Sequence, residues 1–356
     1  MQELLKMKNE ILKKIFEMSE YTNNNGIIGW IKREDCKGEY VYGEITGYFL
    51  SFCSYIYKNT KNSEKKRKII NIVKNNVAWL DKMVGNGMQT RYMFEGKIDW
   101  RNNALFAFDF AMIIRGLNDV SEFTDSKLTL DKYLNEFKKF LSKDKLIYAV
   151  ISNSSQLLPN KWSTNFDIHL MKVAANLYGV KGWDNTISIN IYKKLWNLYS
   201  KEFFKKDSHP IMYFFEGTLL LLNKQNLLIN NQKDINDIVS KFKCLIVENK
   251  VLYNNPTQKE YIRSDVLAQV VRIGSLLYMY NHIPQESFEI IKTNLQFLLE
   301  HFYENGFICF YDKKVECNFY NIWCGMFTVQ AIDFFSKAMQ YGQDEEKASF
   351  MIGELF

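Results

Sequence analysis

The chain has 356 residues, of which 47% are hydrophobic and 15% aromatic, so it can bury a large core. Its formal net charge is +6, from 46 basic and 40 acidic residues. The densest basic run, "KNSEKKRK" at 61–68, has no interleaved aromatic residues and is typical of a solvated helix face. This pattern argues against a nucleic-acid-binding protein.

The sequence predicts a cytoplasmic protein without a membrane segment. No apolar run reaches the about 18 residues that a membrane span needs, and the opening "MQELLKMKNEILKKIFEM" is an amphipathic helix rather than a signal peptide. The cysteines form no Cys-x-x-Cys pair, which fits reduced thiols and does not propose a zinc site. We therefore expect no metal and no other cofactor.

In chain order, the 3.6-residue hydrophobic period predicts twelve helices of two alternating kinds. Amphipathic, Lys- and Glu-rich helices are expected at about 2–20, 62–83, 126–142, 185–204, 233–247 and 285–303. Helices that are apolar on nearly all sides are expected at about 43–58, 102–117, 165–178, 210–223, 263–280 and 319–338. A helix that is apolar all round is buried, whereas a one-sided helix lies at the surface. The alternation predicts an all-α fold, an (α/α)6 toroid of six helical hairpins, in which residues 1–356 form a single domain.

Three segments that precede apolar helices contain a short turn, and we expect each to form a β-hairpin at one mouth of the toroid. They are "MFEGKIDWRNNALFAF" (93–108), "LYNNPTQKEYIRSDVLAQV" (252–270) and "CFYDKKVECNFYNIWCGMF" (309–327). Rigid helices would present loops and first-turn side chains around one cavity there. A functional site is therefore expected at this mouth.

Polar side chains recur on the apolar helices at spacings of three and four, which place them on one helix face. A single polar stripe is explained by a buried interhelical network or by a solvent-facing side. Six stripes on six apolar helices are explained together by a lumen that all six helices line. Asn102 and Asp109 lie seven residues apart on the 102–117 helix, with Asp109 about two turns below the mouth. The other stripes are Glu44, Tyr48, Ser51 and Tyr55; Asn165, His169, Lys172 and Asn176; His209, Tyr213 and Glu216; Asp265, Gln269 and Arg272; and Trp323, Phe327 and Gln330.

Glu216 is the carboxylate that most needs an explanation. It lies in the second turn of an apolar helix that opens on Ser-His-Pro, and burying an ionised carboxylate costs several kcal/mol unless it is paired or used. Asp265 and Asp167 are explained more simply, because a carboxylate in the first turn of a helix is stabilised by the helix dipole. Two roles stay open for Glu216: a proton-transfer group with a raised pKa, or a structural partner of Arg263 or Arg272.

The pattern resembles the six-hairpin glycosidase superfamily and the related N-acylglucosamine 2-epimerase-like proteins. The resemblance covers nearly the whole chain as architecture, and the segments that carry it are "HPIMYFFEG", "RSDVLAQVVRIG" and "NIWCGMFTVQAIDFF". It implies a sugar-binding mouth, with Asp/Glu acid–base pairs in hydrolases and histidines in epimerases. By position, it implies catalytic roles for Glu216, Asp265, His209 and His169. The remaining lining residues are expected to bind substrate: Glu44, Trp162, Asp167, Tyr213, Arg263, Gln269, Arg272 and Trp323.

These features predict an enzyme that processes a sugar or glycan as a hydrolase, lyase or epimerase, with a small molecule or an oligosaccharide as ligand. Two alternatives stay open. A cyclase of the terpenoid or lanthionine type also uses an α-toroid, although the sequence has neither its acidic Asp cluster nor its set of zinc ligands. The other is a non-catalytic toroid that binds a glycan or a protein. The sequence does not indicate an oligomeric state.

Overall fold

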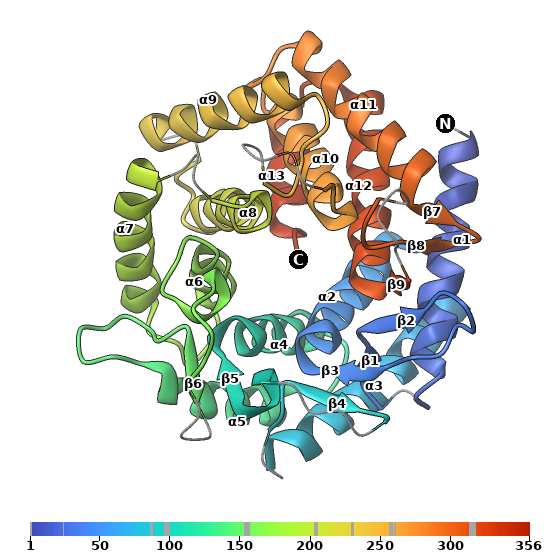
Figure 1. Ribbon diagram of the computed structural model, residues 1–356, viewed down its shortest axis with the longest axis vertical. Coiled ribbons are helices and arrows are strands. Elements are labelled where there is room, and N and C mark those ends of the chain that lie inside the picture. Colours follow the sequence, from blue (N-terminus) through green and yellow to red (C-terminus); the bar gives the residue numbers. More distant parts are fainter. Residues whose placement is uncertain are drawn as a thin grey trace. The chain divides into compact units, whose positions relative to one another are not determined.

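The protein is described by a computed structural model for residues 2–23, 25–85, 88–95, 100–152, 157–202, 206–228, 231–255, 259, 261–312 and 318–356. These residues contain thirteen α-helices and nine strands of two or three residues (Figure 1). The centres of the three predicted hairpin turns, at 96–99, 256–258 and 313–317, lie outside the described residues.

The predicted alternation of buried and surface helices is confirmed. The apolar helices are buried along most of their length and are α2 (Gly43–Asn59), α4 (Ala107–Val120), α6 (Leu170–Leu177), α8 (Ser208–Lys224), α10 (Ser264–Met279) and α12 (Ile322–Tyr341). The amphipathic helices are α1 (Gln2–Glu20), α3 (Ser63–Gly85), α5 (Lys127–Phe137), α7 (Asn185–Glu202), α9 (Gln232–Asn249) and α11 (Gln285–Phe302). A further helix, α13 (Glu345–Gly353), was not predicted, although Asp344 caps it by accepting from the backbone N–H of Lys347.

Two of the buried helices begin five residues later than their periodicity predicts. Before α4, residues 100–103 form a 3₁₀ turn. The next residues, β5 (Ala104–Phe106), pair with β6 (Val150–Ser152), so their backbone N–H and C=O groups are hydrogen-bonded in a sheet instead of in the helix. Before α6, residues 162–164 form another 3₁₀ turn. As a result Asp109 lies in the first turn of α4, not two turns inside it, and Asn165 lies outside α6.

The strands form small sheets next to the helix starts. In one sheet, β3 (Tyr40–Tyr42) pairs with both β1 (Ile27–Ile28) and β4 (Arg91–Met93). The predicted hairpin at 93–108 is therefore wrong, since β4 and β5 belong to different sheets. The hairpin at 309–327 is confirmed by the bridge between Cys309 and Tyr320. The remaining strands are β2 (Trp30–Lys32), β7 (Tyr303–Glu304), β8 (Phe307–Ile308) and β9 (Phe319–Asn321).

Contacts between residues divide the chain into two compact units. The N-terminal unit contains Phe16–Leu198 with Phe356, and the C-terminal unit contains Met1–Ile15 with Tyr199–Leu355. Each unit holds three of the buried helices: α2, α4 and α6 in the first, and α8, α10 and α12 in the second. Both boundaries fall inside helices, α1 and α7, rather than in linkers. The single-domain organisation stays a prediction.

In the N-terminal unit, two glycines let α2 and α4 pack closely. A Cβ atom on Gly47 would lie 2.6 Å from the backbone of Met112 and Ile113, and one on Gly116 would lie 2.3 Å from the carbonyl oxygen of Gly47. Because no side chain separates the two backbones, the first turns of α2 and α4 come together. These turns carry Glu44 and Asp109.

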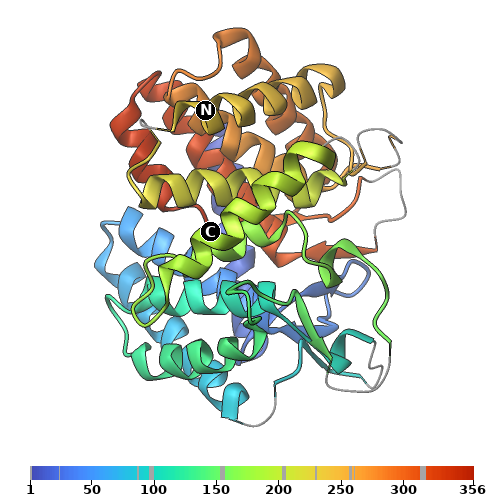
Figure 2. The same cartoon turned by 90° about the vertical axis from the view of Figure 1, so that its left-hand side faces the viewer.

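In the C-terminal unit, α10 is the central helix. It packs against α8, α11, α12 and α13, which are drawn in yellow to red in Figure 2. Every residue from Ser264 to Leu277 of α10 is buried, including Asp265 and Arg272. Polar groups of α10 must therefore find partners on the neighbouring helices.

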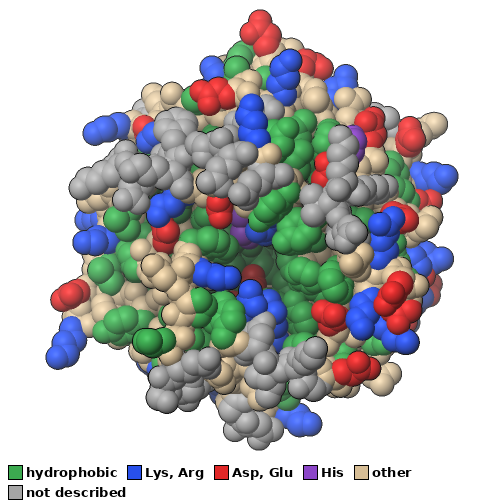
Figure 3. Space-filling model, in the orientation of Figure 1, with side chains coloured by type: hydrophobic (Ala, Val, Ile, Leu, Met, Phe, Trp, Pro, Cys, Tyr) green, Lys and Arg blue, Asp and Glu red, His purple; other side chains and the backbone are tan. Residues whose placement is uncertain are grey.

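The described surface is mixed in charge. On the face in Figure 3, Lys and Arg side chains are interspersed with Asp and Glu. Within the described ranges, no helix has the length and apolar composition needed to cross a membrane.

Candidate functional site

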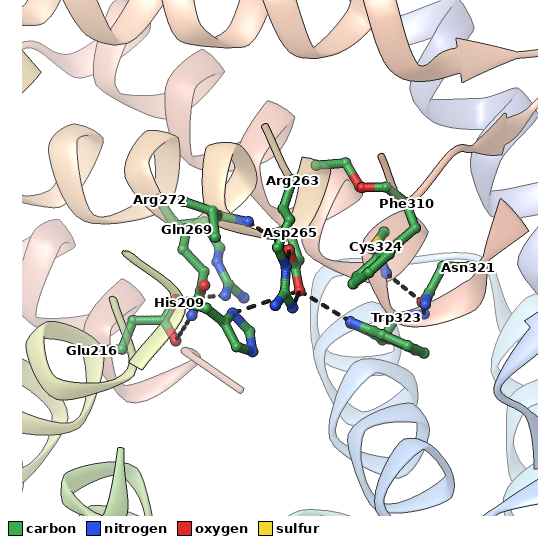
Figure 4. Close-up of polar contacts among 12 residues, drawn as sticks. His209, Glu216, Arg263, Asp265, Gln269, Arg272, Phe310, Asn321, Trp323 and Cys324 are labelled. Carbon is green, nitrogen blue, oxygen red and sulfur yellow. Dashed lines mark hydrogen bonds and ion pairs between the residues drawn. The ribbon is translucent and has the colours of Figure 1, made fainter. Parts of the chain in front are cut away.

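The polar residues of α8, α10 and α12 meet around Asp265 in the C-terminal unit (Figure 4). Arg263 donates to this carboxylate through Nε at 3.0 Å and Nη2 at 2.6 Å, and Trp323 Nε1 lies 3.4 Å from Oδ2. Nδ1 of His209, from the first turn of α8, lies 3.6 Å from the same oxygen. The carboxylate itself is fully buried, whereas the Arg263 side chain is 15% exposed and Trp323 is partly exposed. The cluster thus offers a guanidinium and an indole at its accessible edge.

Asp265 is ionised over the whole neutral range. Burial raises its pKa, but the charges of Arg263 and His209 and the hydrogen bonds outweigh burial and lower the pKa to about 2. Asp265 therefore has no proton to donate near pH 7. It can hold and orient His209, as a carboxylate does for a catalytic imidazole.

The depressed pKa of Asp265 predicts acid sensitivity. Its folded-state pKa is below the unfolded value, so its stabilisation is present above about pH 4 and disappears as the pH falls toward 2. A shift of this size corresponds to about 2 kcal/mol. Urea unfolding between pH 2 and pH 6 should show this loss in the wild type and a smaller pH dependence in Asp265→Asn. Equal pH dependence in the two proteins would contradict this account.

Glu216 lies in a second cluster of the same unit, where it forms an ion pair with Arg272. Arg272 Nη2 lies 2.5 Å from Glu216 Oε1, and Gln269 Nε2 lies 3.2 Å from Oε2. Both members of the ion pair are fully buried. Arg272 also donates to Gln330 Oε1 at 2.9 Å and lies 4.0 Å from the ring centre of Phe327. Of the two arginines considered from the sequence, Arg272 is thus the partner of Glu216.

The three predicted stripes of this unit face one another. His209 opposes Asp265 in the first turns, and Glu216 opposes Gln269 and Arg272 two turns further in. The Tyr213 ring packs against His209 at 4.3 Å between centroids. The catalytic and binding roles predicted for these residues stay predictions.

A different carboxylate cluster occupies the N-terminal unit, where Asp109 and Glu44 lie against each other. Glu44 lies close enough to raise the pKa of Asp109, and the hydroxyl of Tyr42 donates to Asp109 Oδ1 over 3.4 Å. Asp109 is buried, whereas Glu44 is only partly buried. Two carboxylates this close repel each other, so the charge of Glu44 disfavours the ionised form of Asp109.

The pKa of Asp109 is raised well above its usual range. Burial is the main cause, the charge of Glu44 adds to it, and the charge of Arg91 opposes it. Burial likewise raises the pKa of the Tyr42 phenol, which therefore keeps its proton. Asp109 therefore keeps its proton to a higher pH than an isolated aspartate does.

Cations and aromatic rings surround this pair. The Arg91 guanidinium lies 4.6 Å from the ring centre of Tyr40 and 5.5 Å from that of Tyr42, while Asn102 Nδ2 donates to the Arg91 carbonyl at 2.6 Å. A cavity of about 10 Å³ adjoins both carboxyl groups, which is room for about one water molecule. Such a set can transfer a proton beside a bound water.

The remaining predicted residues of the N-terminal unit lie around the start of α6. His169 is buried between Trp162 and Phe108, with ring centroids 5.0 and 5.8 Å away. Asp167 is also buried, and its Oδ1 accepts from the backbone N–H of Ile168 at 2.7 Å. The contacts of His169 are thus largely aromatic.

Sequence reasoning missed Asp109 as a site residue, together with Tyr42 and Arg91. The sequence signal for Asp109 was its place as an acidic residue on an otherwise apolar helix. Because that helix was predicted to begin five residues too early, Asp109 was expected about two turns below the mouth instead of in the first turn. Arg91 and Tyr42 are adjacent only through the pairing of β3 with β4, which no local pattern reveals. Among the residues that the structure describes, no three His, Cys, Asp or Glu side chains are grouped as a metal site would require.

Solved structures with the same architecture are enzymes that act on sugars. A sugar epimerase from a ruminal bacterium superposes with a TM-score of 0.67 at 12% identity, covering 93% of this chain and 98% of its own. A D-mannose isomerase superposes with a TM-score of 0.68 at 12% identity, covering 94% of this chain and 97% of its own. An unsaturated glucuronyl hydrolase specific for heparin superposes with a TM-score of 0.66 at 11% identity, covering 96% of this chain and 99% of its own. No family model matches the chain, and no curated protein matches it in sequence.

At 11 to 12% identity, this likeness establishes the fold and leaves the activity to be argued from the residues. Nearly the whole of this chain and of each neighbour is covered. The neighbours belong to the six-hairpin, glycosidase-like architecture that the alternation of helices predicted. The chain therefore has the (α/α)6 toroid fold.

Proposed function

We propose that the protein is a sugar-processing enzyme of the hydrolase type, in which the Glu44–Asp109 pair transfers the proton. The observation that carries this proposal is a buried aspartic acid next to a second, partly exposed carboxylate, an arrangement that raises the pKa of the buried group. A buried carboxyl group with a raised pKa can give its proton to a glycosidic oxygen and, once ionised, can take a proton from the attacking water, and Glu44 beside Asp109 helps to raise that pKa. The water-sized cavity next to both groups suits this chemistry.

Other groups around the pair suit the substrate. Arg91 presents donors to sugar hydroxyl or carboxylate oxygens, and an arginine binds either kind of acceptor well. Trp100 lies 4.8 Å from the Arg101 guanidinium and provides a partly exposed ring for packing against a sugar. The hydrolases among the structures with this fold act on sugars, which supports the same substrate class for this chain.

A second candidate function is isomerisation or epimerisation through His209. The observation that favours it is the contact of His209 with Asp265, which is ionised at neutral pH, beside the accessible Arg263 and Trp323. An imidazole held by a carboxylate can remove the proton next to a sugar carbonyl and return it. Three sugar epimerases and isomerases share the fold.

One screen distinguishes the two functions. The protein is incubated in D₂O with saturated and unsaturated oligosaccharides, aldoses and N-acylated amino sugars, and products are followed by NMR. Hydrolysis releases new reducing ends and should disappear in Asp109→Asn, whereas epimerisation places deuterium on the carbon next to the carbonyl and should disappear in His209→Gln. We expect the first result. Deuterium incorporation that survives in Asp109→Asn and is lost in His209→Gln would overturn the proposal in favour of the second function.

A further inference from the structure

A groove of about 800 Å³ lies on the N-terminal unit and belongs to neither cluster described above. Its walls come from the segment after α1, the β2–β3 turn and the end of β4. The residues that the argument uses are Tyr21, Lys32, Lys37, Glu39, Phe94 and Glu95. A volume of this size is within the range of sites that hold small organic molecules. We call it the Tyr21–Phe94 groove.

Two aromatic rings form the apolar part of the groove. Tyr21 is 50% exposed and Phe94 is 48% exposed, and their centroids lie 6.3 Å apart with the planes at 66°. Their edge-to-face contact holds the two rings in place while leaving ring surface accessible. Exposed, fixed aromatic surface suits the C–H faces of sugar rings, which are apolar and flat.

The charged side chains select among the ligands that stack on aromatic rings. Lys32 and Lys37 are matched by Glu39 and Glu95, so the lining has no net charge and offers no net electrostatic attraction to a polyanion. Ammonium and carboxylate groups supply both donors and acceptors, which is what hydroxyl groups require. Aromatic faces ringed by balanced polar groups thus favour an uncharged, hydroxyl-rich ligand over a nucleic acid or a lipid.

The β3–β4 ladder connects the groove to the Glu44–Asp109 pair within the same unit. Met93 lines the groove and is paired with Tyr40, while Arg91, two residues earlier, is paired with Tyr42 beside Asp109. Residues two apart on a strand share a face, and their Cα atoms are separated by about 7 Å. A sugar chain that follows this face extends from the Tyr21–Phe94 groove to the Glu44–Asp109 pair.

We propose that the Tyr21–Phe94 groove binds neutral sugar units of an oligosaccharide or polysaccharide, at a distance from the bond that reacts. This inference deepens the proposed function and rests on it for the identity of the ligand as a substrate. The groove gives the enzyme a preference for longer chains, because the additional units bind where no chemistry occurs.

Native gel electrophoresis through immobilised polysaccharides tests binding without requiring activity. Gels that contain soluble starch, xyloglucan or galactomannan are compared with gels that contain heparin or hyaluronan. We expect at least one neutral polysaccharide to retard the wild type, the Tyr21→Ala/Phe94→Ala variant to lose most of this retardation, and Phe94→Tyr to keep it. Tyr341→Ala/Phe350→Ala removes two other exposed rings, 41% and 62% exposed, and should migrate like the wild type.

The outcomes separate this inference from the proposed function. Retardation of the wild type that the double variant retains, retardation confined to heparin or hyaluronan gels, or no retardation at all overturns the groove proposal. Asp109→Asn should bind the gels like the wild type. If Asp109→Asn also keeps full activity while the double variant loses binding, the proposed function fails and the glycan-binding groove stands. With active enzyme, the double variant should lose the advantage of long over short chains and keep its rate on the shortest substrate.

Discussion

Replacing Asp109 with asparagine is expected to lower turnover by about 10²–10⁴-fold, the range for loss of a general acid or base. The same substitution should raise the stability of the folded protein at neutral pH. The folded-state pKa of Asp109 is above its unfolded value, so stability falls as the pH rises from about 4 through the folded pKa. Asparagine has a similar shape and carries no charge, so it removes the loss of stability that comes from ionising the buried carboxyl group. Loss of activity with a gain in stability is the behaviour of a residue kept for function.

Asp119 provides the matched control on the same helix. It accepts from Arg115 Nε at 2.7 Å, and no cluster of the candidate site includes it. Asp119→Asn should therefore weaken that ion pair and leave turnover unchanged. Chemical denaturation at pH 5 and pH 8, together with turnover on the substrate found by the screen, measures both effects. An Asp109→Asn protein that is less stable than the wild type and fully active would assign Asp109 a structural role.

Replacing Glu216 with glutamine is expected to destabilise the protein by about 3–5 kcal/mol, because it leaves the guanidinium of Arg272 buried without its counter-charge. The arginine-paired environment distinguishes Glu216 from Asp109, which another carboxylate, Glu44, influences more strongly than any other charged side chain does. Arg272→Met should cost a similar amount for the reciprocal reason. The double variant Glu216→Leu/Arg272→Met leaves no unpaired charge and should recover much of the loss.

Denaturant unfolding of the single and double variants measures the coupling between the two side chains. Glu64→Gln is the control, because its ion pair with Lys68 is 3.3 Å long and largely exposed, and its loss should have no measurable effect. If Glu216→Gln is as stable as the wild type and loses turnover, Glu216 is a catalytic group after all. If it is stable and active, the carboxylate has neither role.

The contrast between Glu216 and Asp109 shows why the sequence could not distinguish the environments of the two carboxylates. Both are acidic residues on apolar helices, so composition and periodicity treat them alike. The chemical difference comes from a third residue: Arg272 lies against Glu216, and Glu44 lies against Asp109. Neither neighbour is close in the sequence.

Much of the fold followed from the sequence because its signal is local and repeated. A helix with apolar residues on all sides has to be buried, and six such helices alternating with amphipathic ones leave few architectures. The stripes of α8, α10 and α12 were readable for the same reason, since a spacing of three or four fixes a helix face before any neighbour is known. His209, Asp265 and Trp323 were therefore grouped correctly.

Only the tertiary structure determined where α4 and α6 begin and which charges meet. The start of α4 depends on the pairing of β5 with β6, whose residues lie more than forty positions apart, and this moved Asp109 into the first turn. The approach of α2 to α4 depends on Gly47 and Gly116, and it brings Glu44 against Asp109. The pKa of a carboxyl group is set by burial and by the charges within a few ångströms. The sequence by itself therefore determined the fold class and the faces of the buried helices, whereas contacts between distant segments decided which carboxyl group has a raised pKa.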